Sequence, residues 1–252
     1  TKQSNIMKKK GVFIFLLLLW SLGPFLLQLY TSFSSTDSII KPFNLIEHKW
    51  TIDNYILVLN SEPPFWRYLL NSTLVGLAST TITLFLSVPA AYAISGIKSK
   101  LKNIFRIFLL TASLFPYVLL FLSLLEIARN FDLGNNLLAL SLPYSALSMP
   151  LAIILLSSAF NDLPKDLEEA ARIEGLNLFQ RLRWILLPLI APATASTGII
   201  VFLFSWNEYP IALTWISKSN LITLPVAIAR IAGSSVYSVP YGAFAAATVI
   251  GA

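Results

Sequence analysis

The stretch Tyr68–Ile97 reads YLLNSTLVGLASTTITLFLSVPAAYAISGI and contains no charged residue. A helix rises about 1.5 Å per residue, so about 20 apolar residues are enough to cross the hydrocarbon core of a bilayer. Lipid offers no hydrogen-bond partners to the backbone, whereas a helix satisfies its own polar groups. The stretch therefore predicts a membrane-spanning helix.

Similar charge-free runs recur along the chain of 252 residues, of which 56% are hydrophobic and 12% charged. Soluble domains carry about 25% charged residues, so most of this surface is expected to face lipid. We predict an all-α membrane protein whose single transmembrane domain covers residues 11–252, with external loops at 31–66 and 218–240. The six predicted spans are residues 11–33, 68–97, 105–127, 134–160, 187–213 and 240–252, the last of which we expect to be truncated.

The distribution of lysine and arginine predicts the orientation of these spans. With a cytoplasmic N-terminus, twelve of the 18 basic residues lie on the inner side, close to span ends, and six lie outside. The positive-inside rule selects this orientation for a multi-pass membrane protein. It also explains the net charge of +6 without a nucleic-acid partner. The inner residues are Lys2, Lys8, Lys9, Lys10, Lys98, Lys100, Lys102, Arg106, Lys165, Arg172, Arg181 and Arg183.

The residue inventory argues against a catalytic centre. Cysteine is absent and His48 is the single histidine, so we expect no thiol nucleophile, no metal site and no cofactor in this chain. The sequence also lacks the G-x-x-x-x-G-K-[ST] phosphate-binding loop. We therefore expect no catalytic residues and no ATP hydrolysis by this chain itself.

The long inner loop, residues 161–187, predicts two short helices around a glycine. The first is expected to begin at 162–163, and its early acidic residues suit the positive end of a helix. Gly175 can adopt the left-handed conformation that ends a helix. Asn177 is then expected to cap the second helix, with Gln180 three residues on as in a capping box.

Part of this loop resembles a known motif. Glu169-Ala170-Ala171 is followed at fixed distances by Gly175, Ile185 and Leu187-Pro188. This spacing resembles the EAA loop of bacterial ABC importer permeases, which forms a coupling helix that docks on an ATPase subunit. The resemblance implies the type I ABC importer permease fold and an ATPase-coupling role for Glu168, Glu169, Ala170, Ala171, Glu174, Gly175, Leu187 and Pro188.

Two further expectations concern how this loop works. Pro188 and Pro192 open the following span, and we expect the loop and that span to move as one rigid lever. The alternative interpretation of the loop is an amphipathic helix that lies on the inner leaflet.

Shorter pieces elsewhere resemble, in the same order, the carbohydrate-type permeases, in particular the smaller permease of the maltose transporter. These pieces are Thr31-Ser32-Phe33, Asn54-Tyr55, Arg67–Ser72, Ala90–Ala93 and Trp206–Tyr209. The resemblance implies a carbohydrate or sugar-like polyol as cargo and the bacterial inner (plasma) membrane as the location. The partners it implies are a second homologous permease, two ATPase subunits that carry ATP and Mg, an external substrate-binding protein and membrane lipid.

Polar and aromatic residues at span ends are candidates for the substrate path. A carboxylate beside aromatic rings suits the hydroxyl groups and faces of sugars, although an anchor at the membrane edge is an equal alternative. Asn71 is a weaker candidate, because an amide can also bond neighbouring helices. The cluster beside the fifth span comprises Trp206, Asn207, Glu208 and Tyr209.

The last external loop is a further candidate by resemblance. In the maltose transporter the corresponding loop of this subunit reaches into the binding protein. By position, Gly233, Ser234 and Ser235 would form its tip here.

Two other classes of protein fit parts of the pattern. A secondary transporter, or half of one, fits six spans, but such proteins usually carry midspan charges for ion coupling, and these span interiors are charge-free. A non-transporting membrane assembly protein would not require the spacing of the 161–187 loop. The sequence therefore favours a permease subunit of an ABC importer.

Overall fold

The computed structural model describes residues 2–35, 49–97, 100–231 and 240–252. Throughout these ranges the regular elements are helices, apart from a single bridge between Ser34 and Trp50. The predicted all-α fold is therefore confirmed.

The chain forms two compact units. One is Leu70–Pro225, and the other combines Thr1–Leu69 with Val226–Ala252. The first unit contains most of α4 (Phe65–Ser95), then α5 (Lys100–Ser113), η1 (Tyr117–Leu120), α6 (Phe121–Asn130), α7 (Leu137–Asn161), α8 (Lys165–Ile173), α9 (Leu178–Arg181), the π-helix η2 (Leu182–Leu186), α10 (Leu187–Leu189), α11 (Ala191–Asn207), α12 (Pro210–Trp215) and η3 (Ser219–Leu221).

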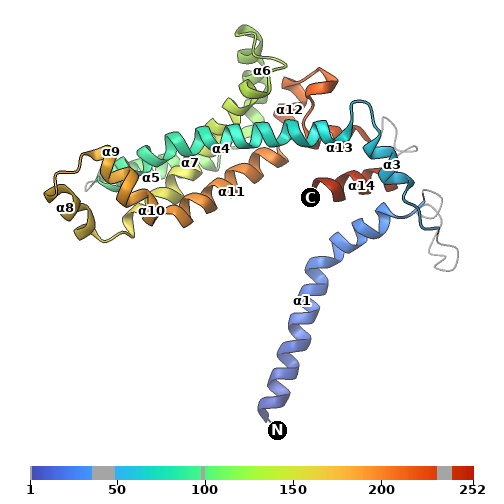
Figure 1. The fold of residues 1–252 in the computed structure, drawn as a ribbon, viewed down its shortest axis with the longest axis horizontal. Helices are drawn as coiled ribbons and strands as arrows, with labels where there is room; N and C mark the ends of the chain where they lie inside the picture. Colours follow the sequence, from blue (N-terminus) through green and yellow to red (C-terminus); the bar gives the residue numbers. More distant parts are fainter. Residues whose placement is uncertain (1, 36–48, 98–99, 232–239) are drawn as a thin grey trace. The chain divides into compact units, whose positions relative to one another are not determined.

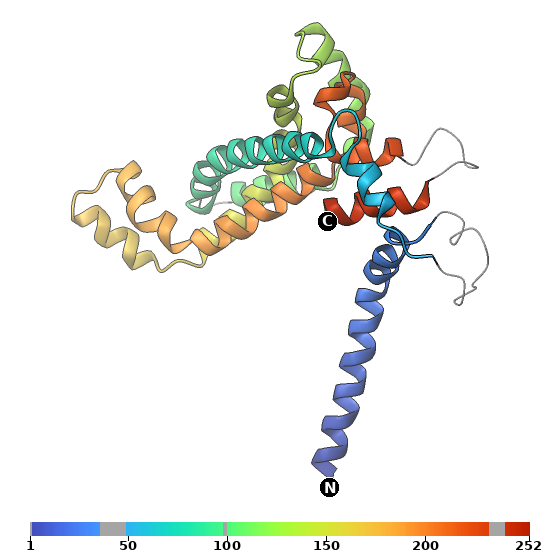
Figure 2. The same cartoon turned by 45° about the vertical axis from the view of Figure 1, so that its right-hand side comes forward.

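The body of the Leu70–Pro225 unit is a bundle of α4, α5, α7 and α11. α7 packs against both α5 and α11, and α4 runs beside them in Figures 1 and 2. At one end of the bundle, apolar side chains of α4, α5, α7 and the segment before α11 form a core cluster. Its buried members are Val88, Ala91, Leu109, Ile153, Leu156, Phe160, Leu186 and Ile190.

Small and hydroxyl residues join α4, α7 and α11. Ser79 Oγ and Ser205 Oγ lie 2.6 Å apart, and Ser145 donates to the backbone oxygen of Ser79 at 3.2 Å. Gly76 faces the ring of Phe202, because a Cβ at this glycine would lie 2.7 Å from the ring. Such residues are a common means of close packing between membrane helices.

The third predicted span, residues 105–127, is not a continuous helix. α5 ends at Ser113, and the chain resumes as η1 and α6 after a bend of 77°. Pro116 lies in the break and has no backbone N–H with which to continue a helical ladder. The charge-free run predicted length and apolarity but not this break.

The fifth predicted span, residues 187–213, is also interrupted. The segment from α9 to α10 meets α11 at a bend of 80°. Pro192 cannot donate to the carbonyl of Pro188, and Ile190 between the two prolines leaves helical geometry with φ −93° and ψ 10°. The span therefore begins with a bend at these prolines, and the movement of the loop and the span as one rigid lever stays a prediction.

Within the described ranges, two helices are long and apolar enough to cross a membrane, namely α4 and α7. The number rises to four if each bent pair counts as one broken span. α14 (Tyr241–Gly251) and the part of α1 from Leu17 to Ser32 are shorter apolar helices.

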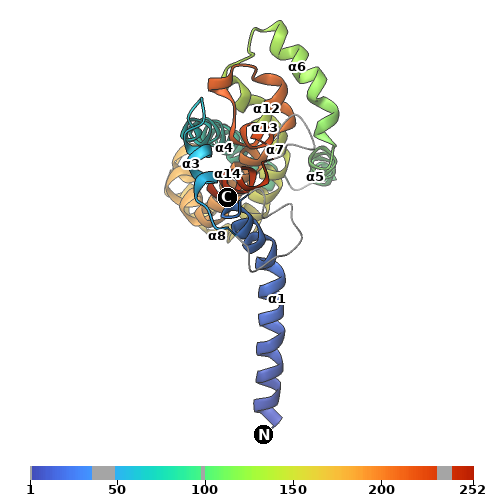
Figure 3. The ribbon, with the colours of Figure 1, turned by 90° about the vertical axis from the view of Figure 1, so that its right-hand side faces the viewer.

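The other unit contains α1 (Lys2–Ser32), α3 (Asp53–Leu59), most of α13 (Leu224–Ile231) and α14. α14 contacts both α1 and α3, and Figure 3 shows it beside the C-terminal end of α1. The Asn54 amide donates to the carbonyls of Ser32 and Ser34 at 2.9 and 3.0 Å, and Gly242 of α14 leaves room for this amide. One side chain thus connects all three helices.

Candidate functional site

The 161–187 loop folds as a pair of short helices. α8 begins at Lys165 rather than at 162–163, because Pro164 is extended and biases the residue before it away from the helical region. Gly175 has φ +80°, as predicted, and ends α8. Asn177 and Gln180 form the predicted capping box, with both hydrogen bonds at 2.9 Å.

The faces of α8 differ in exposure. Ala171 is buried on the side towards the rest of the unit. Glu169 and Ala170 are exposed, and Ile173, one turn further on, is 86% exposed. The predicted coupling residues therefore divide: Glu169, Ala170 and Glu174 face outward, while Ala171 packs inward.

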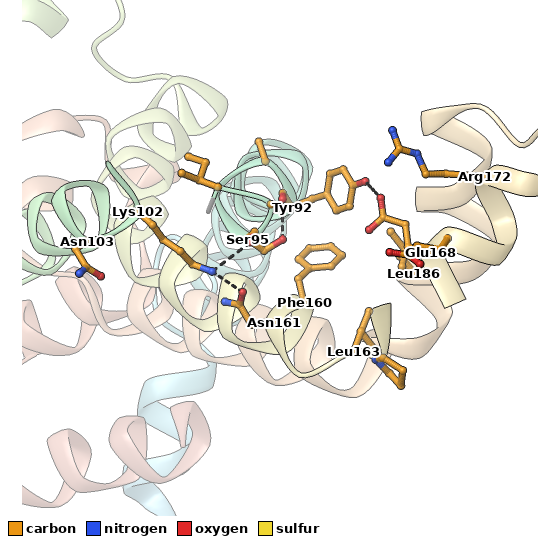
Figure 4. Close-up of a pocket in the computed structure, with 15 residues that line it drawn as sticks. Tyr92, Ser95, Lys102, Asn103, Phe160, Asn161, Leu163, Glu168, Arg172 and Leu186 are labelled. Carbon is orange, nitrogen blue, oxygen red and sulfur yellow. Dashed lines mark hydrogen bonds between the residues drawn. The ribbon is translucent and has the colours of Figure 1, made fainter. Parts of the chain in front are cut away.

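Glu168 has internal partners. Its Oε1 accepts a hydrogen bond from the Tyr92 hydroxyl at 2.5 Å and forms an ion pair with Nη1 of Arg181 at 3.4 Å. Tyr92 belongs to α4 and Arg181 to α9, and Figure 4 shows the Tyr92–Glu168 contact. Glu168 thus links three helices, and neither Tyr92 nor Arg181 was identified as a site residue from the sequence.

The C-terminal side of the loop is anchored in the core cluster. Leu186 and Ile190 are members of that cluster, and Leu187 packs against it. Pro188 is exposed. Leu187 therefore fixes the end of the loop, whereas Pro188 contributes no buried contact.

A cavity of about 880 Å³ lies between α8 and the ends of α4, α5 and α7. Its walls include Tyr92, Lys102, Asn161, Glu168 and Arg172 (Figure 4). The Lys102 ammonium donates to the Asn161 side chain at 2.7 Å and to the carbonyl of Ser95 at 3.2 Å. Lys102 on α5 thereby ties the end of α4 to the end of α7.

Glu208 does not offer a free carboxylate. It is 3% exposed, and its two oxygens accept from the Tyr144 hydroxyl at 2.6 Å and from the amides of Ile211 and Ala212 at 2.9 and 3.1 Å. The first turn of a helix has unpaired amides, which this carboxylate satisfies in α12. In the structure Glu208 therefore caps the first turn of α12 and is bonded to α7.

The residues beside Glu208 have different surroundings. Trp206 stacks on Phe202 with ring centroids 5.5 Å apart. Asn207 is exposed and donates to the carbonyl of Leu203 in its own helix. Tyr209 is 37% exposed. In this cluster Glu208 is therefore buried, whereas Asn207 and Tyr209 are exposed.

Asn71 has a structural position. Its amide donates to the carbonyls of Asn220 and Ile222 at 3.1 and 2.9 Å, and the side chain is buried. The neighbouring Ser72 accepts from the amide of Leu224 at 2.8 Å. The start of α4 is thereby joined to the 220–224 segment.

The remaining predicted site residues, Gly233, Ser234 and Ser235, lie outside the residues that the structure describes. The two sites that are described lie far apart. The 161–187 loop and α12 stand at opposite ends of the Leu70–Pro225 unit (Figures 1 and 2).

The fold is that of an ABC importer permease. The whole chain matches 92% of a chain in a bacterial ABC transporter involved in the import of the acidic polysaccharide alginate, with a TM-score of 0.77 and 21% sequence identity. Residues 83–252 match the family described as binding-protein-dependent transport system inner membrane component. The chain therefore belongs to this family of multi-pass inner-membrane transport permeases.

Three relatives match most of the chain. The sulfoquinovosyl glycerol transport system permease protein SmoH of Agrobacterium fabrum is 36% identical over 94% of this chain and 82% of its own length. The trehalose/maltose transport system permease protein MalG of Thermococcus litoralis is 38% identical, with 91% and 82% covered. The trehalose transport system permease protein SugB of Mycobacterium tuberculosis is 36% identical, with 84% and 77% covered.

Proposed function

We propose that this chain is a transmembrane subunit of an ATP-driven importer that moves a carbohydrate or sugar-like polyol across the bacterial inner membrane. A second permease, two ATPase subunits that bind ATP and Mg, and an external binding protein complete the proposed assembly. The cargo class is supported by the relatives SmoH, MalG and SugB, which are permease proteins of sulfoquinovosyl glycerol, trehalose/maltose and trehalose transport systems.

The observation that carries the coupling role is the outer surface of the 161–187 loop. Glu169 and Ala170 are exposed next to Ile173, and α9 adds Leu178 and Phe179, which are 53% and 67% exposed. A capped helix pair with an exposed apolar face and a rim carboxylate is suited to a protein cleft lined by basic residues. We infer that this surface docks on an ATPase subunit.

The proposed topology has six spans with the N-terminus in the cytoplasm. The separation of the loop from α12 at opposite ends of one unit supports placing the loop inside and the Trp206–Tyr209 cluster outside. The two bent pairs would then be broken spans rather than straight ones. Broken helices within a membrane are tolerated where neighbouring protein surrounds them.

Closure of the ATPases on binding ATP would move α8 in this account. Since Leu186 and Ile190 hold the end of the loop in the core cluster, displacement of α8 would reorient the bundle helices around that cluster. The path between the two permeases would then change from inward-facing to outward-facing.

Uptake in cells that lack the gene tests this proposal. Labelled trehalose, maltose, glycerol and sulfoquinovosyl glycerol serve as probes, and we expect uptake of one such compound to be lost and then restored by the wild-type gene. Glu169→Lys should restore less than a tenth of that uptake, because it reverses the charge at the docking surface.

Asp162→Lys is the matched control, because Asp162 is an exposed acidic residue of the same loop outside α8. It should restore full uptake. Full uptake with Glu169→Lys would contradict the docking role, and unchanged uptake of every probe in the deletion strain would contradict the proposed cargo class.

A further inference from the structure

Two adjacent glutamates in α8 have opposite surroundings. Successive residues of a helix are rotated by about 100°, so neighbours face different directions. Glu169 is exposed, whereas Glu168 is bonded to Tyr92 and Arg181. A carboxylate that already has two internal partners is poorly placed to serve a docking protein.

Two covalent routes join α8 to the bundle. On its N-terminal side, residues 162–164 connect it to α7. On its C-terminal side, the chain passes through α9, the π-helix Leu182–Leu186 and the 80° bend before α11. Neither route leads directly from α8 to α4.

A polar contact joins α8 directly to α4. Tyr92 lies in the last turn of α4, and its hydroxyl contacts Glu168 directly. Arg181 is only 8% exposed, and it holds the same carboxylate oxygen from α9. The cavity beside these residues leaves α8 room to move relative to the helix ends.

We propose that Tyr92, Glu168 and Arg181 form a latch that passes the movement of α8 to the end of α4. Glu168 is then a positioning residue, and Glu169 is the docking residue. The Lys102 contacts with Ser95 and Asn161 extend the effect, because they tie the ends of α5 and α7 to the same turn of α4. This inference rests on the proposed coupling role of the 161–187 loop.

Distance measurements between spin labels test the latch. The chain has no cysteine, so Ala93→Cys and Arg172→Cys provide its only labelling sites on α4 and α8. The labelled chain is isolated with its ATPase and partner permease from native membranes. The distance between the labels is then measured without nucleotide and after trapping with ATP and vanadate.

With the latch intact, we expect one narrow distance distribution that is the same in both states, because the two helix ends move together. Tyr92→Phe removes only the hydroxyl group and should broaden the distribution and make it depend on nucleotide. Glu168→Gln keeps an acceptor for Tyr92 but removes the charge that binds Arg181, so an intermediate effect is expected. Tyr117→Phe is the control, since its ring packs on Phe204 away from the loop.

Identical distributions for wild type and Tyr92→Phe would overturn the latch, and so would a nucleotide-dependent change with the latch intact. Recovery of the ATPase with the labelled wild-type chain separates these results from a failure of the proposed function. If the wild type retains no ATPase, it is the coupling role itself that fails.

Discussion

The 161–187 loop and the Trp206–Ala212 segment both contain glutamate in a short motif, yet they use it in opposite ways. In the loop, Glu169 is exposed on the short helix α8. In the other segment, Glu208 is 3% exposed and bonded to Tyr144 and to the first amides of α12. The comparison teaches that neighbouring residues in sequence do not decide whether an acidic residue is a contact surface or an internal cap.

The tertiary partner decides between these roles. Tyr144 reaches Glu208 from α7, at a sequence separation of 64 residues. Nothing comparable approaches Glu169 among the hydrogen bonds and ion pairs of the described residues. Glutamate is therefore integral to the fold in one region and available to a partner in the other.

The largest expected difference comes from the same substitution at both positions. Glu208→Ala leaves a buried hydroxyl and two amides without an acceptor, and each such loss costs about 1–3 kcal/mol. We expect the free energy of unfolding to fall by about 3 kcal/mol or more. Glu169→Ala should change it by less than about 0.5 kcal/mol, as is usual for exposed sites.

Chemical denaturation in detergent micelles, followed by tryptophan fluorescence, measures both variants. Equal losses in the free energy of unfolding for Glu208→Ala and Glu169→Ala would contradict the distinction between an internal cap and a contact surface. Glu208→Gln should fall between wild type and Glu208→Ala, because it keeps acceptor capacity at one oxygen.

Asn71 offers a smaller test of the same distinction. Asn71→Ala deprives two carbonyls of their donor at a buried position, and we expect a loss of about 2 kcal/mol. Asn207→Ala is the matched control, since Asn207 is exposed and its amide donates to the carbonyl of Leu203 in its own helix. A smaller loss in the free energy of unfolding for Asn71→Ala than for Asn207→Ala would show that the buried contacts of Asn71 do not stabilise the fold.

The smallest expected effect concerns the backbone of the loop. Gly175 has φ +80° and no atom near an added Cβ, so Gly175→Ala meets a conformational cost of about 1 kcal/mol rather than a clash. Gly23→Ala, inside α1 and just before Pro24, should be neutral or slightly stabilising, because an added Cβ meets no atom and helical glycine is less favourable than alanine. The same unfolding measurement compares them, and a stabilising Gly175→Ala would contradict the left-handed turn.

The parts of the molecule that could be predicted from the sequence depend on local chemistry. The left-handed turn at Gly175 and the capping box at Asn177 follow from residues within one helical turn, and both are confirmed. Lipid-facing helices follow from the lack of charge. Family membership follows from the spacing of the EAA-like residues and is confirmed by the match over residues 83–252.

The remaining features depend on contacts between residues far apart in the sequence, or on prolines that interrupt an otherwise apolar run. Tyr92 and Glu168 are separated by 76 residues, and no local pattern marks them as partners. Pro116 and Pro192 were visible, but charge-free runs alone do not distinguish a straight span from a bent one. The burial of Glu208 could not be predicted either, because its donor Tyr144 comes from α7, 64 residues away.

Co-purification from native membranes, with partners identified by mass, tests the central claim most directly. The account predicts recovery of the wild-type chain with a second permease and two ATPase subunits in stoichiometric amounts. The Glu169→Lys variant should retain the second permease and lose the ATPase. Recovery of the wild-type chain as a stable protein without an ATPase would contradict the account.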